Sequence, residues 1–157
     1  MKISLLLTGK TDSSWLSQGI ALYQSRLQHY IRFEIIVCQA PRKWAALSVD
    51  ELRRKEGTML LAHMAQADLC ILLDEKGKQY DSVAFAHWLQ HQMNRSTRHL
   101  MFVVGGAWGF SPEVYQAAHG RLSLSEMTFS HQMIRLFFAE QLYRAMTILK
   151  GESYHNA

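Results

Sequence analysis

Cysteine is scarce in this sequence, and long apolar runs are absent from it. Cys38 and Cys70 are the only cysteines, and each lies in or beside a strand-like run. This placement favours reduced thiols in a cytosolic core over a disulfide or a redox pair. No apolar run approaches the roughly 18 residues of a membrane span. The short apolar run over residues 3–7 also lacks the small-residue cleavage site of a signal peptide. We therefore expect a cytoplasmic protein that contains no membrane segment.

Several common catalytic patterns are missing as well. The chain contains no P-loop, no Ser/His/Asp arrangement and no paired carboxylates. His87 and His91 have the i,i+4 spacing that can hold zinc, but the glutamate of the metalloprotease motif and a third ligand are absent. A solvated helix face is the favoured interpretation of this pair, and we expect no metal.

The composition indicates one folded unit with an uneven distribution of charge. Hydrophobic residues make up 48% of the chain and charged residues 19%, which predicts a single globular domain over residues 1–157. Residues 1–55 carry nine of the 17 basic residues but only four of the 13 acidic ones. From composition alone, nucleic-acid contact and a solvated face explain this excess equally well. The basic segment over residues 39–47 is the expected mobile loop, where Trp44 either grips RNA or packs onto the domain.

Strand-like and helix-like segments alternate along the chain. Strands are expected over residues 3–7, 33–37, 69–73, 100–104 and 122–124. Helices are expected over residues 14–28, from a capping box at Ser48 to about 63, over 82–93, after Ser111-Pro112, and from Ser130 to about 150, where Gly151 ends the last one. This alternation predicts an α/β fold, with a mostly parallel sheet and helices on both of its faces.

Polar residues and glycines gather in the last third of the chain. The run Gly105-Gly106-Ala107-Trp108-Gly109 lies between an expected strand and an expected helix, and it lacks the G-x-G-x-x-G spacing of a dinucleotide site. We favour close approach of a ligand to its backbone over a turn that only needs positive φ. On the last helix, Glu140 and Arg144 have the spacing of an ordinary ion pair. That helix is apolar on most sides, so we expect it to be buried, and a buried arginine there needs a partner such as a carboxylate or an RNA phosphate.

Several short motifs occur in a fixed order in this region. They are Val103-Val104-Gly105-Gly106 with Gly109, Leu124-Ser125-Glu126-Met127-Thr128-Phe129, His131-Gln132-Met133-Ile134-Arg135, Glu140-Gln141-Leu142-Tyr143-Arg144-Ala145 and Gly151-Glu152-Ser153-Tyr154-His155. Through this ordered set the chain resembles, over essentially its whole length, the ribosomal RNA large subunit methyltransferase H family of the SPOUT class. One departure is Ser130, which stands where the family usually has proline.

The resemblance implies a fold, a reaction and a set of site residues. The implied fold is an α/β sheet with a C-terminal trefoil knot, assembled as a homodimer with active sites at the interface. The implied reaction moves a methyl group from S-adenosyl-L-methionine, without a metal, to N3 of a pseudouridine in 23S rRNA on the assembled ribosome. The implied cofactor residues are Leu73, Gly105, Leu124, Ser125, Glu126, Met127, Thr128 and Phe129. Those expected to place the target nucleotide are His131, Arg135, Arg144, Tyr154 and His155.

Two other functions are compatible with the same fold. One is a knotted methyltransferase that acts on tRNA, although the small size, with no added RNA-binding domain, favours reliance on the ribosome surface. The other is a non-catalytic assembly factor that binds the ribosome. Stoichiometric binding of the cofactor would distinguish an enzyme from such a factor.

Overall fold

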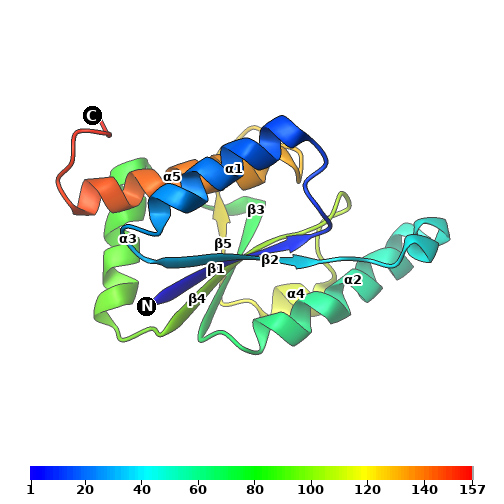
Figure 1. Cartoon of the computed structure of the whole chain (residues 1–157). Helices are drawn as coiled ribbons and strands as arrows, with labels where there is room; N and C mark the ends of the chain where they lie inside the picture. The colour runs from blue at the N-terminus through cyan, green and yellow to red at the C-terminus, as the bar shows by residue number, and fades with distance from the viewer. Residues whose placement is uncertain (157) are drawn as a thin grey trace.

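Five parallel strands form one sheet at the centre of the computed structural model, which describes residues 1–156 (Figure 1). The strands are β1 (Lys2–Thr8), β2 (Arg32–Cys38), β3 (Leu69–Gln79), β4 (His99–Val104) and β5 (Gly120–Ser123). Their order is β2-β1-β4-β3-β5, and every neighbouring pair is parallel. The predicted α/β class and parallel sheet are therefore confirmed.

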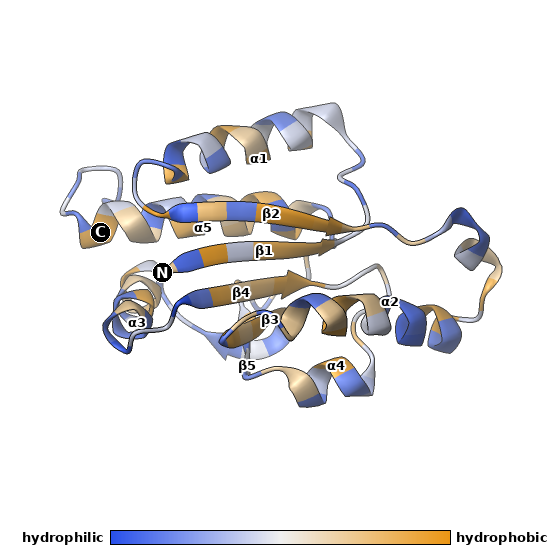
Figure 2. Ribbon diagram, turned by 60° about the horizontal axis from the view of Figure 1, so that its bottom comes forward, coloured by the Kyte–Doolittle hydropathy of each residue, from blue (hydrophilic) through white to orange (hydrophobic). Residues whose placement is uncertain are grey.

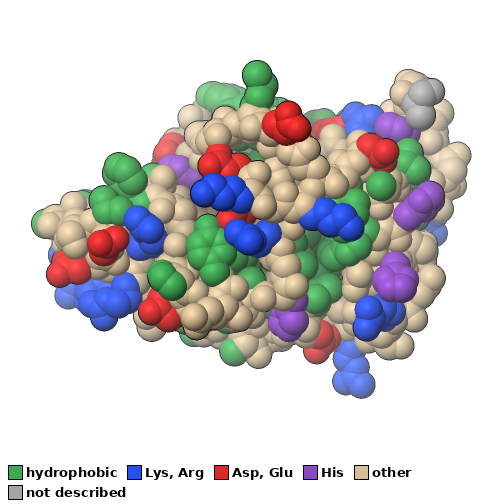
Figure 3. Space-filling model, turned by 180° about the vertical axis from the view of Figure 1, so that it is seen from behind, with side chains coloured by type: hydrophobic (Ala, Val, Ile, Leu, Met, Phe, Trp, Pro, Cys, Tyr) green, Lys and Arg blue, Asp and Glu red, His purple; other side chains and the backbone are tan. Residues whose placement is uncertain are grey.

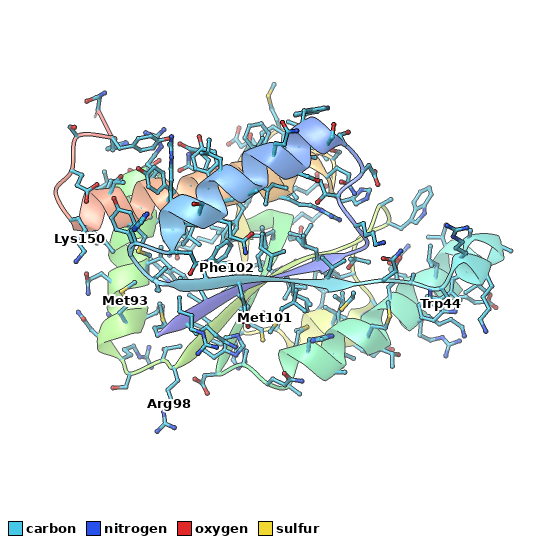
Figure 4. The ribbon with its side chains drawn as sticks, viewed as in Figure 1. Trp44, Met93, Arg98, Met101, Phe102 and Lys150 are labelled. Atoms are coloured by element: carbon cyan, nitrogen blue, oxygen red, sulfur yellow. The ribbon has the colours of Figure 1, made fainter. Side chains whose placement is uncertain are left out.

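Helices cover both faces of this sheet. They are α1 (Ser14–Leu27), α2 (Val49–Met64), α3 (Ser82–Asn94), α4 (Pro112–Ala117) and α5 (Met133–Leu149), with a short 3-10 helix η1 (Arg42–Ala46). One apolar cluster joins the sheet to α1, α3 and α5, and a second joins it to α2 and α4. In β4, Phe102 belongs to the first cluster and Met101 to the second, and Figure 4 shows the two side chains on opposite sides of the sheet.

Because both faces are covered, the central parts of β1, β2 and β4 are apolar and appear orange in Figure 2, whereas these strands begin with hydrophilic residues, which appear blue. Cys38 and Cys70 are free and buried in the α2/α4 cluster, where burial raises the pKa of the Cys70 thiol to about 11. No helix within residues 1–156 has the length and apolarity needed to cross a membrane.

Short-range signals in the sequence fix several helix ends. Ser48 Oγ accepts a hydrogen bond from the N–H of Glu51 at 3.3 Å, which begins α2, and Ser111 Oγ accepts from Val114 at 3.4 Å, which begins α4. Gly151 has φ of +69°, a left-handed conformation that suits glycine at the end of α5. These predicted ends are confirmed.

The start of α5 differs from the expectation. The helix begins at Met133 and not directly after Ser130, although Ser130 Oγ still accepts from the N–H of Met133 at 3.1 Å. The intervening residues extend the loop that follows β5, and Ser130 and His131 line the cavity described below.

Strand β3 is longer than predicted because it contains an irregularity. Leu73 and Lys78 both pair with Leu122 of β5, so the residues between them bulge out of the ladder. Gly77 permits this bulge, because a β-carbon there would lie 2.7 Å from the backbone of β5. Asp74 and Glu75 consequently face the cavity beyond the strand ends.

The segment predicted as a mobile loop contains η1, which Figure 4 shows at the outer tip of the molecule around Trp44. Lys55 Nζ of α2 lies 5.4 Å from the centre of the Trp44 ring. In this structure Trp44 therefore packs against Lys55, and the prediction that it grips RNA stays a prediction.

Candidate functional site

A cavity of about 590 Å³ lies beyond the carboxyl ends of β3, β4 and β5. The sequence-predicted cofactor residues that line it are Leu73, Gly105, Leu124, Ser125, Met127, Thr128 and Phe129. Glu126 is the exception, because its exposed side chain is not part of the wall. A concave site of this size at the carboxyl edge of a parallel sheet is the usual location of a small-molecule site.

Two glycines shape the loop after β4 for different reasons. Gly109 has φ of +77°, and its N–H donates to the carbonyl oxygen of Gly106 at 3.1 Å, which closes a tight turn. Gly105 has no positive φ, but a β-carbon there would lie 3.1 Å from Cε1 of Phe110 and 3.3 Å from the carbonyl oxygen of Gly109. The glycines therefore serve the turn as well as leaving the backbone open to the cavity.

The second wall of the cavity is the loop after β5, which is held by its own side chains. Ser123 Oγ donates to the carbonyl oxygen of Ser125 at 2.8 Å, and Ser125 Oγ accepts from the N–H of Met127 at 2.9 Å. Thr128 Oγ1 donates to the Glu75 carboxylate in the bulge of β3. These bonds order the loop before any ligand binds, which lowers the entropic cost of binding.

Two residues of the cavity wall, Asp74 and Tyr115, were not predicted as site residues from the sequence. The Tyr115 hydroxyl donates to Oδ2 of Asp74 at 2.7 Å, and burial together with this carboxylate raises the pKa of Tyr115 to about 12. Arg121 Nη1 lies 3.9 Å from the same oxygen. The position of Asp74, directly after the buried end of a strand, was the signal in the sequence that could have identified it.

His131 and Arg135 lie at the start of α5 and have different environments. His131 lines the cavity, and burial, reinforced by the Arg135 cation, lowers the pKa of its imidazole below the usual value. His131 is therefore neutral at neutral pH, and a neutral imidazole offers a ring nitrogen that can accept a proton.

Arg135 is completely buried and binds backbone groups. Its Nη1 donates to the Gly9 carbonyl oxygen at 2.9 Å and to Thr11 Oγ1 at 3.2 Å, and its Nη2 donates to the Thr8 carbonyl oxygen at 2.9 Å. The expected carboxylate or phosphate partner is replaced by these oxygens, and burial lowers the pKa of the guanidinium. A group with no exposed surface does not reach a nucleotide, so Arg135 acts in this chain as a positioning residue that ties α5 to the end of β1.

Arg144, Tyr154 and His155 form a second cluster around the carboxylate of Glu140. Glu140 Oε1 accepts from Nη2 of Arg144 at 2.6 Å and from the Tyr154 hydroxyl at 3.0 Å. Arg144 Nη1 lies 3.4 Å from Nδ1 of His155, and the guanidinium lies 4.7 Å from the centre of the Tyr154 ring. The bond to Glu140 raises the pKa of Arg144, and burial raises that of Tyr154.

One chain does not bring this second cluster to the cavity. Ile134, at the first turn of α5, lines the cavity, whereas Arg144 lies about ten residues and so roughly 15 Å further along the helix. The structure therefore groups the predicted residues into two sets at opposite ends of α5. Within residues 1–156 no three His, Cys, Asp or Glu side chains gather as a metal site, and His87 and His91 are both exposed.

Comparison with known proteins agrees with this architecture. A family model described as "Predicted SPOUT methyltransferase" matches residues 1–155. The match covers nearly the whole chain, which therefore belongs to the SPOUT methyltransferases. The parallel sheet, with a ligand-sized cavity between the loops that follow β4 and β5, is compatible with an enzyme of this class.

Individual relatives define the family within that class. The chain is 49% identical over 156 residues to a protein from Christiangramia forsetii and 50% identical to one from Porphyromonas gingivalis, with 99% of each chain covered. A relative from Parabacteroides distasonis is 48% identical with the same coverage. All three carry the name ribosomal RNA large subunit methyltransferase H, and this chain belongs to that family.

Proposed function

We propose that this protein transfers a methyl group from S-adenosyl-L-methionine to N3 of a pseudouridine in 23S rRNA, in the cytoplasm and on the assembled ribosome. The observation that carries the cofactor part is the cavity of about 590 Å³, whose walls contain the two loops singled out in the sequence. The RNA part rests on the names of relatives near 50% identity over the whole chain. Residues 1–157 would form one methyltransferase domain, although Ala157 lies outside the described residues.

The cavity residues suit S-adenosyl-L-methionine. Leu73 and Leu124 supply apolar surface for an adenine ring, and the backbones of the two loops supply donors and acceptors for its edge. The cofactor supplies a methyl group on an already activated sulfonium, so no metal is required. The chain's own residues would orient the two reactants, exclude water and, at His131, accept or orient a proton.

We also propose that the loop after β5 and α5 form the trefoil knot implied by the family. Two contacts support this arrangement: α5 returns across the sheet to pack on α1 and α3, and Arg135 binds the carbonyl groups that end β1. The segment thus passes from the edge strand β5 to the middle of the sheet.

A homodimer would complete the active site. Large apolar side chains are exposed on the outer faces of α1 and α5, with Trp15 58%, Leu22 48% and Phe137 38% exposed. Packing α5 against α5 of a second chain in antiparallel orientation would bring the Arg144 cluster of one chain to the cavity of the other. The separation of the two sets of residues within one chain supports this shared site.

Calorimetry with S-adenosyl-L-methionine tests the cofactor assignment. A Gly105→Val variant places a side chain against Phe110 and Gly109, so the cavity wall must shift and affinity is expected to fall at least about tenfold. Glu126→Ala is the matched control, because Glu126 lies in the loop after β5 but its side chain does not line the cavity. Wild-type affinity in a folded Gly105→Val protein would remove this loop from the cofactor site.

Mass spectrometry of 23S rRNA from cells lacking the protein tests the reaction itself. Loss of one methyl group on a pseudouridine is expected. Cofactor binding with intact rRNA methylation would favour a non-catalytic factor, and a methyl group lost from tRNA would favour the tRNA enzyme.

Basic side chains on α2 are expected to hold the ribosome by phosphate contacts. Arg54 is exposed, and Arg53 is partly packed, with its Nη2 3.8 Å from Asp50. Replacing both with glutamine should weaken ribosome binding and lower the slope of log affinity against log salt by about one per lost contact, with cofactor affinity unchanged. Arg98→Gln removes one charge and is the control for the effect of a single lost charge, since Figure 4 shows Arg98 projecting at the other end of the molecule. If each charge lost on α2 has the same effect as the charge lost at Arg98, the α2 side chains contribute only through the net charge of the protein.

A further inference from the structure

A second cavity, of about 390 Å³, lies between α3 and the edge of the sheet formed by β3 and β5. Leu122 is the one described residue that lines both cavities, so this one is a separate site. In Figure 3, which views the molecule from behind, an apolar hollow lies to the right of the centre and blue and purple side chains rim it. Nothing in the proposed methyl transfer uses this hollow.

Aromatic side chains form one wall of the second cavity. The rings of Trp88 and Phe85 are stacked, with centres 6.1 Å apart and planes 12° from parallel. Tyr80 lies beside Trp88, with ring centres 6.4 Å apart. Trp88 and Tyr80 are both partly exposed, so part of their surface is open to a ligand. Such a wall binds flat rings, and nucleic-acid bases stack on it whatever their sequence.

Gln92 lines this cavity, and its side-chain amide is open to it. Only 8% of the residue is exposed, and within residues 1–156 its side chain makes no hydrogen bond. The amide atoms themselves are accessible, since Arg53 Nε is the one fully buried side-chain nitrogen or oxygen without a partner in the described chain. An accessible amide on an otherwise buried side chain can hydrogen-bond to a ligand in the cavity. The Gln92 amide presents a donor and an acceptor side by side, the arrangement with which glutamine pairs with the edge of a base.

The rim of the cavity is positively charged. Lys78 and Arg95 are exposed and form no ion pair within the described chain, and Lys78 Nζ lies 4.7 Å from the centre of the Tyr80 ring. Nδ1 of His119 accepts from the N–H of Cys70 at 3.0 Å, which leaves Nε2 of the ring to carry a proton. Among residues 1–156 no acidic residue lines the cavity, so its charge suits an anion attached to a flat ring.

We propose that this cavity binds an unpaired nucleotide of the RNA substrate other than the one that is methylated. Its base would stack on Trp88 and Tyr80 and pair with the Gln92 amide, while the flanking phosphates contact Lys78 and Arg95. The inference rests on the proposed action on ribosomal RNA. It gives the protein a second RNA contact, between α3 and strands β3 and β5, next to the methyl-transfer cavity with which it shares Leu122.

Two sets of variants test this site in the full-length protein. Gln92→Leu roughly keeps the volume of the side chain and removes the amide, so a purely structural role predicts unchanged RNA binding. We expect instead a three- to tenfold loss of ribosome affinity. Lys78→Gln with Arg95→Gln should weaken binding about tenfold and lower its salt dependence. Arg98→Gln, which removes one charge outside the cavity lining, is the control for the effect of each lost charge. The cofactor affinity and the methylation rate at saturating ribosome should not change in either set.

A direct probe is an octamer of adenosine or uridine ribonucleotides. Fluorescence anisotropy should detect binding of these single strands but not of the duplex they form, and the side-chain amide resonances of Gln92 should shift on addition of a single strand. Wild-type ribosome and octamer affinity in both sets of variants would overturn the proposal. A change in oligomeric state in place of RNA affinity would also overturn it, by assigning the cavity to a contact between chains.

The test separates this inference from the function on which it rests. If the wild-type protein methylates ribosomes and the variants bind them normally, only the second RNA contact is refuted. If the wild-type protein binds single strands through this cavity but methylates no ribosome, the cavity stands as an RNA site and the proposed reaction fails.

Discussion

Deletion of residues 154–157 is expected to reduce single-turnover methyl transfer at saturating ribosome by about 100-fold, the cost of misplacing a reactant by roughly 1 Å. The deletion removes the Tyr154 hydroxyl from Glu140 and the His155 ring from Arg144, and with them the order of the cluster at the end of α5. Ala157, the last residue removed, lies outside the described residues. Affinity for the ribosome should change much less, because the lost effect is one of orientation in the transition state.

Arg144→Ala should produce the same loss with the chain at full length. Glu152→Gln is the control within the tail, since Glu152 accepts a hydrogen bond from Tyr30 and lies outside the Arg144 cluster. The measurement is the rate of methylation of pseudouridylated ribosomes by each variant. Transfer at the wild-type rate by the truncated protein would show that the tail is structural only, and would end our assignment of Tyr154 and His155 to the substrate.

Mixing two impaired variants is expected to restore methyl transfer, because each active site would take its cavity from one chain and its Arg144 cluster from the other. In a heterodimer of Gly105→Val and Arg144→Ala chains, one site carries both defects and the other carries neither. At a cofactor concentration too low to fill the Gly105→Val cavity, the purified heterodimer should therefore work at about half the wild-type rate, while each homodimer is at least about tenfold slower than the wild type. Two different affinity tags on coexpressed chains allow its isolation.

The same experiment decides between shared and separate sites. If cavity and cluster act within one chain, every site in the heterodimer carries one defect and no activity returns. A further check is Phe137→Glu on the exposed face of α5, which should yield monomers by sedimentation and abolish transfer while each chain still binds cofactor. An active monomer would refute the shared site altogether.

Local features of the fold were predictable from sequence, whereas features that depend on distant contacts were not. The strands appear as apolar runs because both faces of the sheet are covered, and Ser48 and Ser111 cap helices through neighbours three residues away. The bulge in β3 depends on pairing with β5, more than 40 residues later, and it therefore left no local signal. The same reason explains why the predicted strand ended at Leu73.

The candidate site shows the same division. The two loops were found from their residues and family motifs, and they meet because parallel strands end at one edge of the sheet. The partners of Arg135 could not be found, since Thr8 and Gly9 lie more than 120 residues away and offer only backbone oxygens. Gln92 carried no signal either, because an unpaired amide is recognisable only once its surroundings are known.

The bonds from Arg135 to the end of β1 also bear on the order in which the chain folds. They join β1, the first strand to be synthesised, to α5, the last helix. This contact therefore forms only after α5 has been synthesised. Contacts of such long sequence separation slow folding, because their loop entropy is lost before they contribute. We therefore expect β1, α5 and the cavity loops to fold late as one cooperative unit, and their backbone amides to lose protection from hydrogen exchange together when that unit opens.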